Sequence, residues 1–173
     1  MRTETITIYT YEELPTDKAK TKARDWYREG WDYPWGDDAI ASLKAFAKHF
    51  GATLRDWSID WSNSCYSSAK FHYTPDDIED ANALEAFIAA KVGELKHDGS
   101  CQFTSYCADD DCNEGAVKAY AAGERDLNAI LQAGFQSWLA AAQADYAASM
   151  EDDAVAESII ANGYEFLADG SRA

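Results

Sequence analysis

The chain has 173 residues and is strongly acidic, with 31 acidic against 15 basic side chains and a formal net charge of −16. A field of this sign excludes nucleic acid and anionic membranes as direct partners and favours basic protein surfaces, including those that normally hold DNA or RNA. Since 47% of its residues are hydrophobic, the chain can bury one sizeable core but is short for two, which predicts a single domain over residues 1–173.

The acidic surplus lies outside the first 28 residues. Residues 1–28 carry six basic and five acidic side chains, so residues 29–173 carry a net charge of −17. Acidity can also serve solubility alone, without any partner. No run of about eighteen apolar residues occurs, and residues 1–10 lack the apolar stretch of a signal peptide, so we expect a protein that stays in the cytoplasm.

The first half of the chain is expected to alternate short strands with helices. Ile6 and Ile8 alternate with threonines, which predicts a strand with one face on the core. Apolar residues then recur at helical spacing, and aromatic residues alternate with polar ones further on. The predicted elements are a strand at 3–10, helices at 15–29 and 40–50, and a hairpin of strands at 53–61 and 65–73.

The second half is predicted to be mainly helical. Thr74 suits a helix N-cap and Pro75 the first helical position, which predicts a helix over 74–96. The further predicted elements are a short strand around Cys101, Phe103 and Tyr106, a long helical stripe from Leu127 to Tyr146 in a stretch rich in alanine from Asn113 onward, a helix from Glu151 to Asn162, and a short strand at 164–167. Together they predict an α+β fold, in which a small antiparallel sheet of about four short strands packs against four to five helices.

The two ends of the chain resemble a family of uncharacterised bacteriophage and prophage proteins. The opening likeness covers the strand at 5–10, Glu13–Leu14 and the run AKTKARDWYREG at 19–30, and the closing likeness covers 156–166 and 169–172. The middle matches only loosely, through the aromatic and serine-rich hairpin. The resemblance implies a phage or mobile-element origin and a bacterial host cell, and some members are labelled antitoxin-like. The resemblance identifies no functional residue in this chain, so it supports a shared fold more than a shared activity.

No arrangement of residues indicates catalysis, a cofactor or a metal. The histidines, His49, His72 and His97, are not accompanied by a nucleophile motif, and there is no glycine-rich phosphate loop, so we expect no enzyme activity. The cysteines are Cys65, Cys101, Cys107 and Cys112. The last three are too widely spaced for the paired ligands of a structural zinc site, so we expect reduced, incidental thiols.

A partial calcium-loop pattern occurs at Asp109, Asp111 and Asn113, which copy the first three ligand positions. Glu114 stands where the sharp turn requires glycine, and Tyr120 stands where the bidentate glutamate belongs. We therefore expect a solvated acidic turn that precedes a helix.

Two kinds of residue are candidates for binding a partner. Acidic residues cluster near three predicted helix starts, where each cluster can compensate a helix dipole, but that role does not explain the imbalance of the whole chain. Three aromatic residues crowd into the turn after the first helix, and aromatic clusters on loops are enriched at interfaces. The predicted partner-binding residues are Asp76, Asp77, Glu79, Asp80, Asp109, Asp110, Asp111, Glu114, Glu151, Asp152, Asp153, Trp31, Tyr33 and Trp35.

These features favour a phage-encoded inhibitor that mimics nucleic acid and occupies a basic surface of a bacterial CRISPR or restriction system. Duplex DNA carries one charge per roughly 1.7 Å of its axis, so about 16 charges correspond to ~27 Å of duplex. The interface should then avoid the basic first helix with Lys18, Lys20, Lys22 and Arg24. One alternative is an antitoxin-like or regulatory module that binds a protein through an exposed aromatic patch. Another is an enzyme with an unrecognised site.

Overall fold

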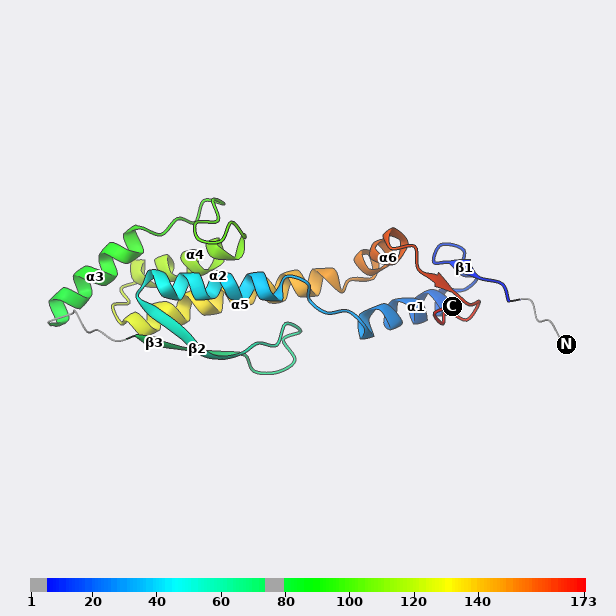
Figure 1. Cartoon of the computed structure of the whole chain (residues 1–173), viewed down its shortest axis with the longest axis horizontal. Helices are drawn as coiled ribbons and strands as arrows, with labels where there is room; N and C mark the ends of the chain where they lie inside the picture. The colour runs from blue at the N-terminus through cyan, green and yellow to red at the C-terminus, as the bar shows by residue number, and fades with distance from the viewer. Residues whose placement is uncertain (1–5, 74–79) are drawn as a thin grey trace. The chain divides into compact units, whose positions relative to one another are not determined.

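The chain combines helices with short strands. The computed structural model describes residues 6–73 and 80–173, and within them the chain forms six helices and two antiparallel two-stranded sheets (Figure 1). The α+β class is therefore confirmed. The described residues do not form the expected single sheet, because the strands pair two by two. The pairs are β1 (Tyr9–Thr10) with β4 (Glu165–Phe166), and β2 (Ala52–Ser58) with β3 (Ser68–Tyr73).

The chain divides into two compact units. The terminal unit comprises the residues up to Tyr33 together with Tyr146–Ala173, and the central unit comprises Pro34–Asp145. Helix α5 (Leu127–Ser149) supplies residues to both, since its residues from Tyr146 onward belong to the terminal unit. The expectation of a single domain over 1–173 stays a prediction.

The terminal unit is built from both ends of the chain. Strand β1 pairs with β4, and helix α1 (Asp17–Glu29) packs against α6 (Asp152–Ala161) (Figure 1). The Thr16 hydroxyl accepts a hydrogen bond from the backbone N–H of Ala19 at 3.1 Å, so α1 begins at Asp17, slightly later than predicted. The buried core consists of Tyr11, Leu14, Ala19, Ala23, Val155, Ile159 and Phe166.

The predicted strand at 3–10 is much shorter in the structure. Only Tyr9 and Thr10 pair with β4, and Ile6 and Ile8 are 69% and 50% exposed rather than packed on a core. The partner strand has two residues, so it offers no ladder for the earlier ones to join. Residues 3–5 lie outside the described part of the chain.

The central unit is built around helices α2 (Gly36–His49) and α4 (Ala108–Ala121) together with the first part of α5. Gly134 of α5 has no side chain, and an added Cβ there would collide with the ring of Phe46 on α2. The Trp138 indole N–H donates to the carbonyl of Ala39 at 3.1 Å, which satisfies its only polar atom inside the core. The largest buried side chains of this unit are Leu43, Phe46, Phe50, Ile88, Leu127, Ile130, Leu131, Phe135 and Trp138.

The predicted hairpin is confirmed, with one irregularity. Strands β2 and β3 are antiparallel, and Leu54 lies opposite Phe71. The register shifts between Leu54 and Asp56, so the next pair is Asp56 with Lys70. Such a bulge reverses the facing of the residues beyond it, so Trp57, opposite Ala69, shares the face of Leu54, although it is still 40% exposed.

Helix α3 (Ala81–Gly93) begins later than predicted. Asp80 is its N-cap, and the Asp80 carboxylate accepts from the backbone N–H groups of Asn82 and Ala83, both at 2.9 Å. The predicted cap Thr74 and the first-turn residue Pro75 lie outside the described residues.

The predicted strand around Cys101, Phe103 and Tyr106 is wrong. Residues 101–107 form consecutive turns, with positive φ angles of 46° at Cys101 and 63° at Ser105. The backbone N–H groups of Phe103 and Thr104 donate to a side chain instead of a neighbouring strand. Their acceptor is the carboxylate of Asp109.

Candidate partner-binding site

The acidic run at 109–114 does not form a solvated turn but the first part of α4. Asp109 is fully buried, and its Oδ2 accepts from the backbone N–H groups of Phe103 and Thr104, both at 2.7 Å. Its Oδ1 accepts from the Thr104 hydroxyl at 3.0 Å, and that hydroxyl lies 2.8 Å from the hydroxyl of Ser42 on α2. Asp109 therefore fixes the loop and is not on the surface, so it leaves the set of candidate binding residues.

The acidic residues that follow Asp109 on α4 are only partly available to bind a partner. The Asp110 carboxylate accepts from the backbone N–H of Gly99, and Glu114 forms an ion pair with Lys118 at 2.7 Å. Asp111 is half-buried, and burial, followed by the neighbouring carboxylates of Glu114 and Asp110, raises its pKa to about 6. At neutral pH this carboxyl is still mainly charged, but it is a weaker source of negative charge than an exposed aspartate.

The acidic residues before α3 contribute one described group. Asp80 is exposed, and its carboxylate is already used by the N-cap hydrogen bonds. Asp76, Asp77 and Glu79 lie outside the described residues.

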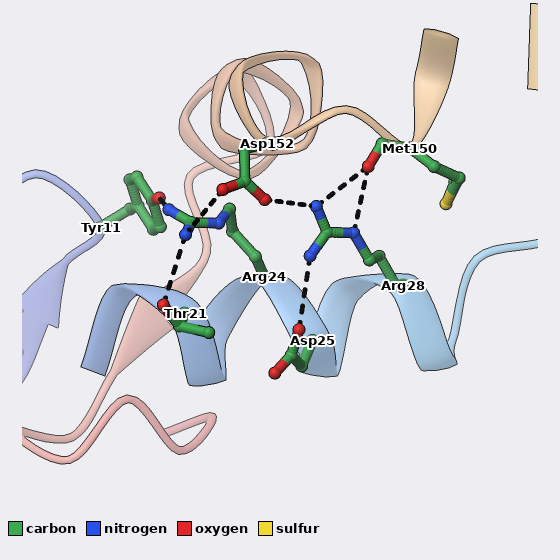
Figure 2. A network of polar contacts seen from close by, with 7 residues as sticks. All are labelled: Tyr11, Thr21, Arg24, Asp25, Arg28, Met150 and Asp152. Atoms are coloured by element: carbon green, nitrogen blue, oxygen red, sulfur yellow. Dashed lines mark hydrogen bonds and ion pairs between the residues drawn. The ribbon is translucent and has the colours of Figure 1, made fainter. Parts of the chain in front are cut away.

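The acidic start of α6 lies beside the basic face of α1, as Figure 2 shows. Asp152 pairs with Arg28 at 2.6 Å and with Arg24 at 3.0 Å. Arg28 also donates twice to the carbonyl of Met150, at 2.9 and 3.1 Å. These contacts, led by the hydrogen bond from Arg28, lower the pKa of Asp152. The basic helix and this acidic cluster thus neutralise each other in part, a pairing that the sequence analysis treated as two separate features.

The other two residues of that cluster remain free of such pairing within the described part of the chain. Glu151 is the N-cap residue of α6 and makes no side-chain cap hydrogen bond. Asp153 lies in the first turn and is exposed. Both suit the positive end of the helix dipole and leave their carboxylates on the surface.

The three aromatic residues predicted to form one patch are divided between the units. Trp31 and Tyr33 belong to the terminal unit, with ring centroids 6.1 Å apart, and Tyr146 packs on both, at 5.6 and 6.2 Å. Trp35 belongs to the central unit, where it is 51% exposed and its ring lies 6.2 Å from that of Tyr106.

Trp31 also lines a depression in the terminal unit, which we call the aromatic pocket. Its volume is 240 Å³, and its lining residues are Trp26, Tyr27, Gly30, Trp31, Asp32 and Tyr164. Trp26 and Tyr164 meet edge to face, with centroids 5.2 Å apart and planes at 83°. Trp26 and Tyr27 fall in the helix predicted at 15–29 and were not among the predicted partner-binding residues. The useful signal was their position one helical turn before Trp31.

Sequence reasoning also missed the acidic start of α2. Asp37 and Asp38 lie in its first turn, and both are exposed. Within residues 6–73 and 80–173, the carboxylates of Asp37 and Asp38 form no ion pair. The helix also has no side-chain cap hydrogen bond. The predicted helix started at Ile40, so these two carboxylates were not recognised as a helix-start cluster.

The cysteines and histidines do not gather into a larger cluster. Cys101 and Cys107 lie with their Sγ atoms 3.7 Å apart, Cys112 is buried, and all four cysteines are free thiols. Ring nitrogen Nε2 of His49 lies 2.8 Å from the carbonyl of Lys91. Among the described residues, no three His, Cys, Asp or Glu side chains are grouped so that they could hold a metal ion.

Comparisons with known proteins found no matching family model, no matching curated protein and no matching solved structure. In the part of the chain that the structure describes, none of the helices has the length and apolar character needed to cross a membrane.

Proposed function

We propose that this protein binds the basic, nucleic-acid-binding surface of another protein in place of the nucleic acid. In this proposal it is a phage-encoded inhibitor of a bacterial defence system of the CRISPR or restriction type, and it acts in the cytoplasm of the host. The phage origin rests on the resemblance of residues 19–30 and 156–166 to phage proteins. The inhibitory role rests on charge.

The observation that carries the proposal is the acidic surplus present in each unit. The sequence of the central unit holds 18 acidic and eight basic side chains, a net charge of −10, and that of the terminal unit holds 13 and seven, a net charge of −6. At one phosphate charge per roughly 1.7 Å, a charge of −10 corresponds to ~17 Å of duplex. Duplex of this length spans part of a nucleic-acid channel.

Exposed carboxylates without a local cation supply the useful part of this charge. Asp37 and Asp38 are the clearest examples, and Asp153 of the terminal unit is another. By contrast, Asp152 and Glu114 are held by arginine or lysine and contribute less field. In each unit, we therefore propose that binding uses the unpaired helix-start carboxylates, and in the central unit not Asp109 and its neighbours.

Affinity capture from the bacterial host tests this proposal. The tagged protein is incubated with lysate at low salt, and the bound fraction is eluted first with duplex DNA or RNA and then with salt. We expect a basic nucleic-acid-binding protein that the nucleic acid releases. Two outcomes would contradict the proposal. In one, nucleic acid does not release the captured partner. In the other, the partner binds nucleic acid and this protein at the same time.

The aromatic pocket favours a second candidate function, an antitoxin-like or regulatory module that buries an aromatic patch on one specific protein. In that case the charge serves solubility. Salt separates the two candidates, because binding through carboxylates weakens steeply as ionic strength rises, whereas binding through an apolar surface is nearly indifferent to it.

A further inference from the structure

The aromatic pocket is assembled from three parts of the terminal unit. Trp26 and Tyr27 lie in the last turn of α1, Trp31 and Asp32 follow the end of that helix, and Tyr164 follows α6. Tyr27 and Tyr164 lie with ring centroids 6.2 Å apart, in addition to the edge-to-face contact of Tyr164 with Trp26. The pocket thus has four aromatic walls, and all four rings are half-buried.

The chemistry of this lining favours a cation. The face of an aromatic ring is negative, so a cation placed over it is attracted, and the attraction grows as water is excluded. Asp32 adds a formal negative charge, is exposed, and has no ion pair among the described residues. Among the residues that the structure describes, no basic side chain lines the pocket. A neutral ligand would cover the carboxylate without replacing its lost hydration.

The same rings already hold a guanidinium within the chain. The guanidinium carbon of Arg172 lies 5.0 Å from the ring centroid of Tyr164 and 5.5 Å from that of Trp26. Arg172 also donates to the carbonyl of Glu165 at 2.7 Å, which fixes its position. Arg172 is not one of the lining residues, so the pocket offers ring surface beyond that which Arg172 covers.

The size of the pocket selects among cations. Pockets for drug-sized ligands measure about 300–1,000 Å³, and 240 Å³ is smaller. A planar guanidinium can stack on a ring while its N–H groups donate to a carboxylate, which an ammonium cannot do in the same way. Arginine and aromatic side chains are also the residues that most often dominate the energetics of protein interfaces.

We infer that the aromatic pocket of the terminal unit binds a guanidinium group, presented by an arginine side chain of the basic protein partner. The assignment of the arginine to a protein partner rests on the proposed function, but the chemistry of the pocket does not. The pocket would then act as an anchor point, while the unpaired carboxylates supply the longer-range attraction.

The test is an NMR titration of the intact protein with N-acetylarginine amide, in parallel with the citrulline amide, which has nearly the same shape but no charge. The indole signals of Trp26 and Trp31 report on the pocket. We expect both to shift with the arginine amide, and the citrulline amide to bind about tenfold more weakly. Absence of a shift with the arginine amide, or equal binding of both probes, would overturn the inference.

A matched pair of variants locates the site. Asp32→Asn removes the carboxylate that lines the pocket, whereas Glu157→Gln removes one charge from an exposed position on α6 that does not line it. We expect the Asp32 variant to bind the arginine amide about three- to fivefold more weakly, and the Glu157 variant to bind as the parent does. Equal weakening by both would assign the effect to overall charge and refute the pocket.

These measurements use no protein partner, so the inference and the proposed function can fail separately. If the arginine amide does not bind while nucleic acid still releases the captured partner, the pocket assignment falls and the proposed function stands. If the amide binds but the captured partner ignores nucleic acid, the pocket remains a guanidinium site and the inhibitor proposal falls.

Discussion

The two units use their carboxylates in different ways. In the terminal unit, acidic residues pair with basic side chains from distant parts of the sequence, as Asp152 does with Arg24 and Arg28 and Asp169 with Lys22 at 2.7 Å. In the central unit, the buried carboxylate of Asp109 binds backbone N–H groups instead of a cation. Both arrangements satisfy a carboxylate, but only the first neutralises its charge with a cation.

The central unit has the larger net charge because it contains more of the chain, and backbone-bound carboxylates add to that charge without a compensating cation. A carboxylate that accepts from backbone N–H groups stabilises a loop or a helix end without needing a lysine or arginine, so the sequence can remain poor in basic residues. Asp80 and Asp60 follow the same pattern: Asp80 caps α3, and Asp60 accepts from the backbone N–H groups of Ser62 and Cys65. Acidic composition is therefore compatible with a stable fold here.

The largest expected effect comes from breaking the backbone contacts of Asp109. Asp109→Ala leaves the N–H groups of Phe103 and Thr104 without their acceptor, and we expect a loss of roughly 3 kcal/mol in the free energy of unfolding. Urea denaturation measures it. Asp56→Asn, at an exposed position of the same unit, is the control and should change stability by less than about 0.5 kcal/mol. Similar losses in both variants would contradict the structural role of Asp109.

A smaller effect is expected in the terminal unit. Arg28→Ala removes two hydrogen bonds to Met150 and the ion pair with Asp152, but this site is partly exposed, so we expect a loss of about 1–2 kcal/mol. Hydrogen exchange should show faster opening of α1 and α6, with α4 unchanged. Lys18→Ala, an exposed position on the same helix, should have almost no effect. Equal loosening of α4 would show that the two units do not open separately.

One carboxyl group in each unit should also make stability depend on pH, and the two dependences should have opposite signs. Burial raises the pKa of Asp111 to about 6, so its contribution to stability is present below pH ~4 and is lost as the pH rises through about 6. Asp111→Asn should therefore be more stable than the parent at pH 7, by about 1 kcal/mol after solvent screening, and equal to it near pH 4.

The contribution of Asp152 to stability depends on pH with the opposite sign. The hydrogen bond from Arg28 lowers its pKa, so its contribution is present above the pKa of an unfolded aspartate, about 4, and is lost as the pH falls. Asp152→Asn should be less stable than the parent at pH 7, and the difference should vanish in acid. Urea midpoints between pH 3 and pH 7 test both variants, and the same sign for both would contradict this account.

The smallest expected effect is on partner binding, where removal of unpaired carboxylates is compared with removal of paired ones. Asp37→Asn with Asp38→Asn removes two unpaired carboxylates, and Asp56→Asn with Glu114→Gln removes two that are paired with Lys70 and Lys118. Net charge changes equally in both double variants. At low salt, we expect the first to bind the captured partner roughly threefold more weakly and the second to bind it almost as the parent does. The reverse order would show that α2 is not part of the proposed binding surface.

Helical periodicity and capping predicted the helices well, because these signals are local. The stripe from Leu127 to Tyr146 lies within α5, and α6 is recognised from its acidic start at Glu151 and its end at Asn162. The strands were harder to predict, since a strand exists only where a partner pairs with it. Ile6 and Ile8 have the right pattern, but β4 is too short to pair with them.

The candidate site was only partly predictable, for the same physical reason. No sequence pattern distinguishes the buried Asp109 from its neighbour Asp111, because the loop at Phe103 and Thr104 that selects Asp109 is positioned by tertiary contacts. The pairing of Asp152 with the basic helix joins residues more than a hundred positions apart. The aromatic pocket needed Tyr164, which comes from the other end of the chain.

The most direct test of the central claim is a competition between this protein and nucleic acid for the purified partner, over a series of salt concentrations. The account predicts that the protein displaces a duplex or single strand completely, and that its affinity falls steeply between about 50 and 200 mM salt, as that of nucleic acid does. A stable complex that holds the partner, the nucleic acid and this protein together, with an affinity indifferent to salt, would contradict it.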